Sequence, residues 1–367
     1  MNDKSKIIKL KDQFKMYSGG YLESPLIAYE TWGELSLNRD NAVIIFTGLS
    51  PSAHAASSQE NPSPGWWEGM IGPGKPLDTD HYFVICVNSL GSCFGSTGPS
   101  SINPMTNDYY RTSFPLLTLE DIAICGFKVL EALEINTVCG TIGCSMGGMT
   151  ALAFCALYPE VTERLLVISS AMSATPFSIA VRSLQREMII RDPKWDNGNY
   201  EINNPPIDGQ RLARKLGMMT YRSPEEWDQR FARTSSRSND ESSEKNKFFD
   251  YFSVESYLQN HANKFTGQFD ANCYLYLSRA SDLFDFSNHG SSLDVAFNSL
   301  GIRESMIIGV ETDILFPIWQ QIELAERLEQ VTEKTEFVKL NCIKGHDSFL
   351  VDLDVFGPVV KRFFSFR

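Results

Sequence analysis

The stretch Gly143-Cys144-Ser145-Met146-Gly147-Gly148-Met149 decides the fold that this sequence predicts. An apolar run over residues 138–142 precedes it, and a helix-length segment that ends at Leu157 follows it. A G-x-S-x-G pattern between a strand and a helix forms a sharp turn that raises the serine hydroxyl above the sheet. The glycines suit this turn, because a Cβ atom at their positions would collide with neighbouring chain. We therefore predict that Ser145 is a nucleophile.

Short apolar runs recur on both sides of this turn and alternate with helix-length segments. Such runs suit strands that are buried on both faces, and their alternation with helices is typical of a parallel sheet. We therefore predict an α/β fold, with a hairpin of residues 14–17 and 26–29 at its edge. The expected strands are residues 42–46, 82–87, 138–142, 165–168 and 306–310, and the expected helices include 119–133 and 149–157.

The alternation of strands and helices stops near Ser170 and resumes near Ser305. Between these points lie helical segments, such as residues 179–190 and 211–219, without a comparable buried-strand run. This pattern predicts a helical cap inserted into one α/β core. The predicted division is residues 1–172 for the first part of the core, 173–303 for the cap and 304–367 for the second part. Within the cap, residues 234–247 are polar throughout and predict a mobile, solvated loop.

The composition narrows the class of partner. The chain has 367 residues, 43% of them hydrophobic and 21% charged, with a net charge of −12. This balance excludes wholesale disorder and makes a broad basic face for nucleic acid or anionic lipid unexpected. We therefore expect small-molecule partners, with no nucleic acid and no membrane.

The cysteines and the N-terminus predict the compartment. Eight cysteines are scattered without a Cys-x-x-Cys pair, so we expect neither a disulfide framework nor a metal site. The charged start of the chain lacks the apolar stretch of a secretory signal, and no apolar run approaches the roughly 20 residues of a membrane helix. We expect a cytoplasmic protein with reduced thiols.

A serine nucleophile needs a histidine base and a carboxylate that orients the histidine. His346 follows a strand-like run and is a better candidate for the base than His54. Asp313 lies at the end of the strand predicted for residues 306–310 and is favoured over Glu311 as the orienting acid. The order Ser145, Asp313, His346 is the order expected of an α/β-hydrolase triad.

An acyl transition state also needs backbone donors for its developing oxyanion. The amide of Met146, directly after the nucleophile, should supply one donor. The amide of Leu49, in the loop after the strand predicted for residues 42–46, should supply the other. His54 would then be part of the structure of this loop.

At these residues the chain resembles the homoserine O-acyltransferase family of α/β-hydrolase enzymes, over nearly its whole length. Members of this family move an acyl group from coenzyme A to the side-chain hydroxyl of an amino acid. The resemblance implies an α/β-hydrolase fold with a helical cap, an acyl-CoA co-substrate, no permanently bound cofactor, and a homodimer built through the cap. The segments that carry it are residues 65–75 (GWWEGMIGPGK), 95–104 (GSTGPSSINP), 143–149, 221–223 (YRS), 254–258 (VESYL), 269–272 (FDAN), 313–317 (DILFP) and 345–349 (GHDSF).

The resemblance also implies two substrate-binding residues. In the family, an arginine in the helix before a Thr-Tyr pair and the aspartate after the catalytic histidine hold the acceptor amino acid. The matching residues are Arg214 and Asp347. A guanidinium group suits the α-carboxylate and a carboxylate suits the α-ammonium group, although either residue could also belong to an ordinary ion pair.

Departures from the commonest acetyltransferase pattern concern specificity. Residues 49–55 read LSPSAHA where acetyltransferases usually have Asp-Ala-His-Ala after the Thr-Gly pair. This longer loop resembles that of the serine O-succinyltransferase branch, which implies L-serine and succinyl-CoA as substrates. The alternatives are L-homoserine as the acceptor and acetyl-CoA as the donor, or a hydrolase with the same triad. The positions that could set specificity are Pro51, Ser52, Ala53, Arg186 and Glu187, and the arginines that could bind a succinyl carboxylate are Arg182, Arg186, Arg214 and Arg222.

Overall fold

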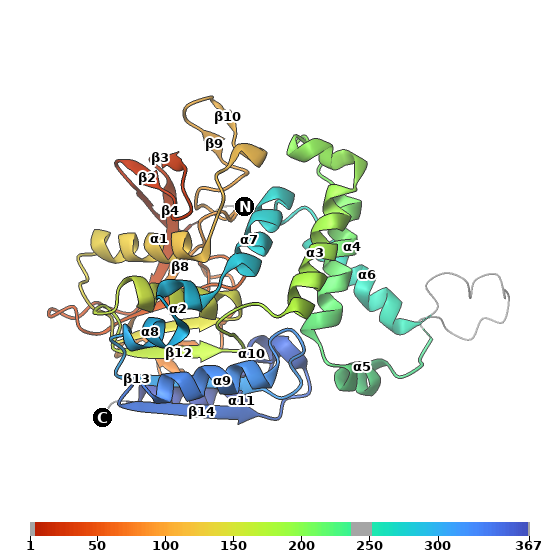
Figure 1. Cartoon of the computed structure of the whole chain (residues 1–367). Coiled ribbons are helices and arrows are strands. Elements are labelled where there is room, and N and C mark those ends of the chain that lie inside the picture. The colour runs from red at the N-terminus through yellow and green to blue at the C-terminus, as the bar shows by residue number, and fades with distance from the viewer. Residues whose placement is uncertain (1–3, 236–251, 366–367) are drawn as a thin grey trace.

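A mostly parallel eight-stranded sheet forms the centre of the computed structural model, which describes residues 4–235 and 252–365 (Figure 1). Its strand order is β1-β4-β8-β5-β11-β12-β13-β14, and only β4 runs antiparallel to its neighbours. The predicted α/β fold with a mainly parallel sheet is therefore confirmed. The strands are β1 (Lys6–Lys9), β4 (Leu26–Trp32), β5 (Ala42–Phe46), β8 (Phe83–Val87), β11 (Gly140–Cys144), β12 (Arg164–Ile168), β13 (Glu304–Val310) and β14 (Lys334–Leu340).

The central strands are apolar without a break because both faces of the sheet are covered. In β5, Ile44 and Phe46 face one hydrophobic core, whereas Val43 and Ile45 face the other. Helices α1 (Leu119–Ala132), α2 (Met146–Leu157) and α9 (Ile318–Glu329) contribute to the first core. Helix α11 (Leu353–Phe364) and the loops around Trp67 contribute to the second. This double burial explains why period-two alternation is missing from these strands.

The N-terminal hairpin differs from the prediction. Strands β2 (Gln13–Lys15) and β3 (Tyr21–Glu23) form a small hairpin of their own. The second predicted strand, residues 26–29, belongs instead to β4, which pairs with β1 and β8 in the main sheet. The β4 side chains are mostly buried, so the strand is held by the core rather than by its sequence neighbour. The remaining short strand pairs are β6 (Ile71–Gly72) with β7 (Leu77–Asp78), and β9 (Ile102–Asn103) with β10 (Asp108–Tyr109).

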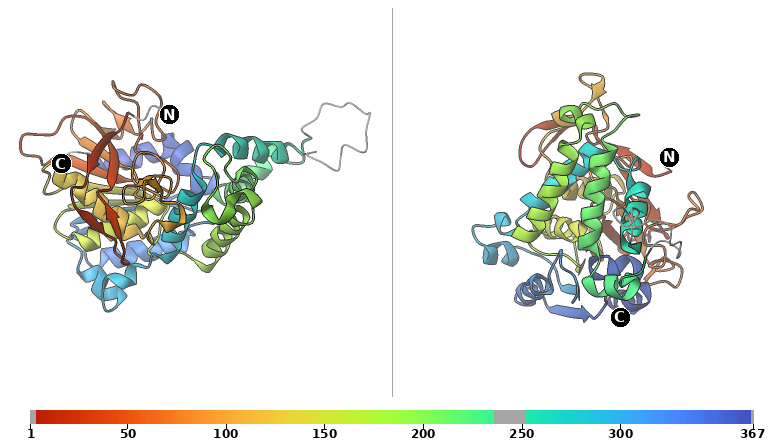
Figure 2. Two further views of the ribbon diagram at one scale, coloured as in Figure 1. Left: turned by 90° about the horizontal axis from the view of Figure 1, so that it is seen from above. Right: turned by 90° about the vertical axis from the view of Figure 1, so that its right-hand side faces the viewer.

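The helical cap stands to one side of the sheet (Figures 1 and 2). Between β12 and β13, the described residues add no strand to the main sheet. Most of the polar segment 234–247 lies outside the described residues. None of the helices in the described ranges is long and apolar enough to cross a membrane. The cap helices are α3 (Pro176–Ile190), α4 (Ile207–Tyr221), α5 (Pro224–Phe231), α6 (Ser253–Phe265) and α7 (Ala271–Leu283).

The end of the interval 173–303 belongs to the core layer rather than to the cap. Helix α8 (Leu293–Asn298) lies beside α2 over the sheet in Figure 1. Phe286 and Phe297 are fully buried there and are part of the same hydrophobic core as α2. The predicted boundary at residue 303 rests on the resumption of buried strands. A short helix such as α8, which packs on the sheet before the next strand, has no sequence pattern that separates it from a cap helix.

Candidate active site

Ser145 occupies a strained turn between β11 and α2. Its backbone has φ 56° and ψ −126°, a region that residues with a side chain rarely adopt. A Cβ atom on Gly143 would lie 2.1 Å from the carbonyl oxygen of Gly147, and one on Gly147 would lie 2.1 Å from that of Phe46. The predicted strand, turn and helix are confirmed, and these two positions require glycine. The helix begins earlier than predicted, at Met146, because the buried turn overrides the low helix propensity of the glycine pair.

The structure brings Ser145, His346 and Asp313 together in one hydrogen-bonded chain. Nε2 of His346 lies 2.8 Å from Oγ of Ser145, and its Nδ1 lies 2.7 Å from Oδ2 of Asp313. The three residues follow β11, β14 and β13, respectively. Because the carboxyl ends of parallel strands meet at one edge of a sheet, residues that are far apart in sequence converge there.

Asp313 fixes the tautomer of His346. Its Oδ1 accepts hydrogen bonds from the amides of Leu315 and Phe316, each at 2.9 Å. An ionised carboxylate only accepts, so Oδ2 must receive the proton on Nδ1 of His346. Nε2 is then free to accept the proton of Ser145. The alternative acid, Glu311, is half exposed and pairs with Lys339 at 2.8 Å, away from this chain of hydrogen bonds.

The surroundings of His346 favour its protonated form. The ring is buried, and it lies 5.3 Å from the ring of Phe316 and 5.7 Å from that of Phe349, measured between centroids. Burial alone would lower the pKa of His346, but the charge and hydrogen bond of Asp313 outweigh it and leave this pKa above its usual value. The imidazolium ion that forms when Ser145 loses its proton is therefore stabilised.

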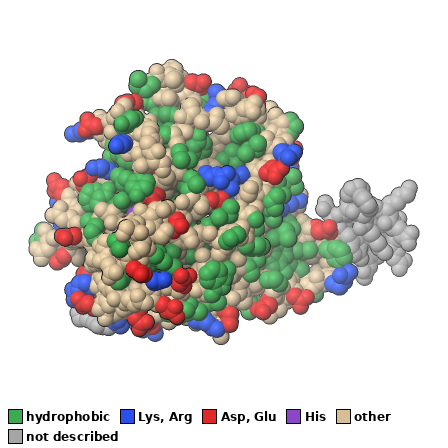
Figure 3. All heavy atoms as spheres, in the orientation of Figure 1, with side chains coloured by type: hydrophobic (Ala, Val, Ile, Leu, Met, Phe, Trp, Pro, Cys, Tyr) green, Lys and Arg blue, Asp and Glu red, His purple; other side chains and the backbone are tan. Residues whose placement is uncertain are grey.

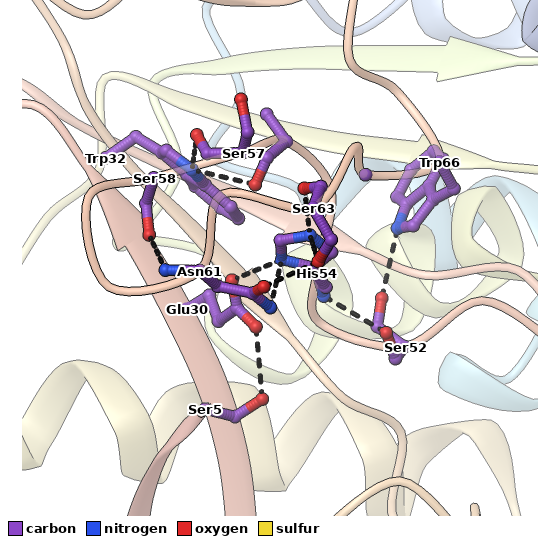
Figure 4. Close-up of polar contacts among 12 residues, drawn as sticks. Ser5, Glu30, Trp32, Ser52, His54, Ser57, Ser58, Asn61, Ser63 and Trp66 are labelled. Carbon is purple, nitrogen blue, oxygen red and sulfur yellow. Dashed lines mark hydrogen bonds and ion pairs between the residues drawn. The ribbon is translucent and has the colours of Figure 1, made fainter. Parts of the chain in front are cut away.

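His54, the alternative base, is part of the structure of its loop (Figure 4). Its Nδ1 lies 2.8 Å from Oε2 of Glu30, and its Nε2 lies 2.8 Å from the carbonyl oxygen of Ser63. A carbonyl oxygen only accepts, so Nε2 of His54 must carry a proton and cannot take another. The prediction that His54 serves loop structure agrees with this geometry, which ties the loop after Leu49 to strand β4.

A small closed pocket of about 40 Å³ lies over the nucleophile. Leu49 and Met146 both line it, and neither amide donates a hydrogen bond to any described residue. Both residues that are predicted to supply oxyanion donors therefore line the same pocket as Ser145. The other residues that line this pocket, here called the acyl pocket, are Ser145, Arg182, Gln185, Thr220, Tyr221, Tyr274, Ser281, Leu315 and Phe316.

Arg182 and Arg186 both bind the buried carboxylate of Asp282, yet only Arg182 reaches the acyl pocket. Nε of Arg182 lies 2.5 Å from Oδ1, and Nη2 of Arg186 lies 2.6 Å from Oδ2. Nη2 of Arg182 is buried without a hydrogen-bond partner among the described residues. The predicted contact of Arg186 and Glu187 with substrate is not supported, because both line a separate outer groove of about 680 Å³ between α3 and α7. Glu187 pairs there with the exposed Arg191.

The other predicted specificity positions lie beside the acyl pocket rather than in it. Pro51 and Ser52 line a larger cleft of about 1040 Å³, and Ala53 is fully buried. They follow directly on Leu49, whose amide faces the nucleophile. These residues would therefore affect substrate specificity indirectly, by setting the position of the loop that carries Leu49.

Arg214 and Asp347 lie close to Tyr221, at the base of the cap. The guanidinium carbon of Arg214 is 4.5 Å from the centre of the Phe265 ring and 5.5 Å from that of Tyr221. Oδ2 of Asp347 lies 3.4 Å from Nε of Arg222. Burial raises the pKa of Asp347, and the positive charges of Arg222, His346 and Arg214 only partly offset this effect. The two residues make no ion pair with one another within the described ranges.

Tyr221 and Tyr274 also line the acyl pocket. No sequence motif predicts a catalytic or substrate-binding role for either tyrosine. Tyr221 lies in the segment 221–223, which contributed only to the resemblance. Tyr274 shares one face of α7 with Ser281, two helical turns on. This spacing could have identified a common face, but not that the face meets Ser145. No group of three or more His, Cys, Asp or Glu in the described ranges is arranged to hold a metal ion.

Comparison with known proteins confirms the fold. A model of the alpha/beta hydrolase fold family matches residues 41–352, so the chain belongs to the α/β hydrolase fold family. Within it, the chain belongs to the group of serine and homoserine O-acyltransferases, as the resemblance predicted.

Three relatives represent this group. The chain is 52% identical to the serine O-succinyltransferase of Litchfieldella anticariensis, over 100% of this chain and 99% of that protein. It is 49% identical to the L-serine/homoserine O-acetyltransferase of Streptomyces lavendulae, over 98% and 97% of the two chains. The crystal structure of homoserine O-acetyltransferase from Bacillus anthracis matches with a TM-score of 0.89 at 26% identity, over 99% of this chain and 98% of that one.

Proposed function

We propose that this protein is an L-serine O-succinyltransferase that works through an acyl-enzyme on Ser145. The observation that carries the proposal is the hydrogen-bonded chain of Ser145, His346 and Asp313 beside a small pocket that is also lined by Arg182, whose buried Nη2 has no hydrogen-bond partner among the described residues. The names of the relatives at 52% and 49% identity support the reaction class. The product would be an activated serine for the synthesis of cysteine.

The first half-reaction acylates the enzyme. Nε2 of His346, 2.8 Å from Oγ, takes the proton as Ser145 attacks the thioester carbonyl of acyl-CoA. The amides of Leu49 and Met146 stabilise the oxyanion. His346 then gives its proton to the departing thiolate, so that coenzyme A leaves as a free thiol. No permanently bound cofactor is needed, because acyl-CoA is consumed as a substrate.

The second half-reaction transfers the acyl group to the acceptor. His346 deprotonates the hydroxyl group of the amino acid, which attacks the ester on Ser145. Arg214 pairs with the α-carboxylate of the acceptor and Asp347 with its ammonium group. The lack of an ion pair between these two residues supports this role, since each keeps capacity for a substrate.

Arg182 is the best of the four candidate arginines for binding a succinyl carboxylate. Its Nη2 lacks a partner, and its side chain lines the acyl pocket with Ser145. Arg186 is held by Asp282 and by Oγ of Ser278, at 2.8 Å. Arg222 pairs with Glu226 and Asp347. The choice of succinyl over acetyl therefore rests on one buried guanidinium nitrogen that an acetyl group would leave without a hydrogen-bond partner.

A hydrolase is the second candidate function, because water could replace the acceptor alcohol. Release of the coenzyme A thiol, measured with and without acceptor, separates the two reactions. Turnover without any acceptor, at the rate seen with serine, would reject the transferase.

A two-by-two assay tests the substrates. L-serine and L-homoserine are each combined with succinyl-CoA and acetyl-CoA, and kcat/KM is measured for the four pairs. We expect the highest value for serine with succinyl-CoA. One extra methylene changes the free energy of binding by about 1–3 kcal/mol, so homoserine should retain weak activity. A preference for homoserine would move the protein to the synthesis of methionine.

The assembly and the compartment complete the proposal. Leu212 and Met219 on α4 and Leu184 on α3 are half exposed, and Figure 3 shows hydrophobic side chains gathered over the cap near α4 and α5. These faces support a homodimer that meets through the cap, which light scattering after gel filtration would test. The free state of all eight cysteines supports a reducing compartment such as the cytoplasm.

A further inference from the structure

Two cysteines meet where the core touches the first turn of a cap helix. Cys93 lies in the loop after β8, and Cys273 lies in the first turn of α7. Each of the two cysteines contacts Asp270, so their side chains lie side by side. Cys93 is partly exposed and lines the cleft of about 1040 Å³, whereas Cys273 is buried. One sulfur of the pair is therefore open to small solutes.

Asp270 holds both cysteines in place. Its backbone amide donates to Sγ of Cys93 at 3.4 Å, and its Oδ1 accepts from the amide of Cys273 at 2.9 Å. On the far side, Oγ of Ser100 lies 3.5 Å from Sγ of Cys273. These contacts hold both cysteines at the same place, beside Asp270, without any contribution from the catalytic residues.

The two sulfurs differ in reactivity. The hydrogen bond from Cys273, together with the amide of Asp270, lowers the pKa of Cys93 despite its partial burial. Burial raises the pKa of Cys273. A partly exposed cysteine with a lowered pKa beside a buried cysteine with a raised one has the form of an attacking and a resolving cysteine.

We propose that Cys93 and Cys273 form a reversible disulfide when the protein meets hydrogen peroxide, and that this bond fastens the cap to the core. The thiolate of Cys93 attacks one peroxide oxygen, the O–O bond breaks, and hydroxide leaves and becomes water. Sγ of Cys273 then attacks the sulfenic acid on Cys93, the S–O bond breaks, and a second water leaves with the Cys273 proton. Two thiols lose two electrons and the peroxide gains two.

The bond would act on turnover through α7. Tyr274, the neighbour of Cys273, lines the acyl pocket. A disulfide has an S–S length of about 2 Å, and the contacts that both cysteines make with Asp270 keep the approach of the two sulfurs short. A covalent link between α7 and the core restrains the helix that carries Tyr274, and this restraint slows turnover if loading of the acyl pocket moves α7. The disulfide itself does not depend on the proposed function, whereas the activity readout does.

Mass spectrometry tests the disulfide directly. The reduced protein is exposed to hydrogen peroxide, the remaining thiols are alkylated, and the intact and digested protein is weighed. We expect six of the eight cysteines to be alkylated and one linked peptide pair that joins Cys93 to Cys273. Turnover should fall about tenfold, and dithiothreitol should restore it together with both thiols.

Three variants complete the experiment. Cys93→Ser and Cys273→Ala should each abolish the linked peptides and remove the effect of peroxide on turnover. Cys139→Ser is the matched control, because Cys139 is also partly exposed, but burial raises its pKa to about 11. This variant should respond as the wild type does. Free thiols at both positions after peroxide treatment, or a sulfinic acid on Cys93 with Cys273 still alkylated, would overturn the proposal.

Discussion

Arg182 and Arg186 share the carboxylate of Asp282, one through each oxygen. All three side chains are less than a tenth exposed. Two cations therefore share one anion, and only Arg182 also lines the acyl pocket. This cluster carries one positive charge in excess, and Nη2 of Arg182 is buried in it without a hydrogen-bond partner among the described residues.

Replacing Arg182 should change the choice of acyl donor. Arg182→Gln removes the charge, and a hydrogen bond to a charged group contributes about 1.5–3 kcal/mol. We expect kcat/KM for succinyl-CoA to fall about 10- to 100-fold, whereas that for acetyl-CoA changes little. Arg191→Gln is the control, since Arg191 is exposed at the end of the same helix. Equal losses for both donors would contradict binding of the succinyl carboxylate by Arg182.

Asp282→Asn should destabilise the fold strongly. It leaves two buried guanidinium groups without their anion, and breaking a buried ion pair costs about 3–5 kcal/mol. Urea unfolding, followed by circular dichroism, measures this loss. The matched change Asp294→Asn removes a largely exposed partner of Arg327 and should cost at most about 1 kcal/mol. Similar unfolding midpoints for the two variants would show that Asp282 is not needed to balance the charges.

The sequence was sufficient to predict the core and the triad because each rests on a local pattern. Ser145 is identified by the glycines that its turn requires, and Asp313 and His346 by their places after buried strands. Parallel strands impose the rest, since their carboxyl ends meet at one edge. The same rule favours Asp313 over Glu311 as the orienting acid, because Asp313 lies further beyond the end of its strand, where the chain turns over the sheet edge.

The acyl pocket was predicted less well because its wall comes from the cap. Arg186 lies one helical turn beyond Arg182 on the same face of α3, and this advance along the helix brings it, with Glu187, to the outer groove. Which face of α3 meets Ser145 depends on how α3, α4 and α7 pack, and such contacts leave no mark in a single sequence. The pair of Cys93 and Cys273, 180 residues apart, was hidden for the same reason.

The rate of acylation should fall as the pH is lowered, with a midpoint above the usual pKa of histidine, about 6.5. The proposed reaction needs neutral His346 to accept the proton of Ser145, and the pKa of His346 is raised. The protonated, inactive fraction therefore appears at a higher pH than for a free histidine. Rapid-mixing measurement of the burst of coenzyme A gives the profile, and circular dichroism at each pH excludes unfolding. A midpoint below that of free histidine would contradict the influence of Asp313.

Asp347→Asn should separate stability from function. The pKa of Asp347 is raised in the folded protein, so folding favours its protonated form. Its contribution to stability is complete below the unfolded pKa, about 3.9, and is lost as the pH rises through the folded value. The asparagine variant stays neutral at every pH. Its stability relative to the wild type should therefore increase between the unfolded and the folded pKa of Asp347, by about 1.4 kcal/mol for each unit of pKa shift, and stay constant above the folded pKa. Urea unfolding between about pH 4 and pH 8 measures the difference.

The same variant should slow the second half-reaction and spare the first. When Asp347 loses its carboxylate, the ammonium group of the acceptor loses its partner. Acylation of Ser145 involves no amino acid and should therefore be unaffected. We expect a normal burst of coenzyme A followed by slow transfer to serine. Ser348→Ala is a suitable control, because Ser348 is the buried neighbour of Asp347 and its Oγ donates to the carbonyl oxygen of Gly345. An asparagine variant that is less stable than the wild type at neutral pH, or that is slowed equally in both steps, would exclude Asp347 from acceptor binding.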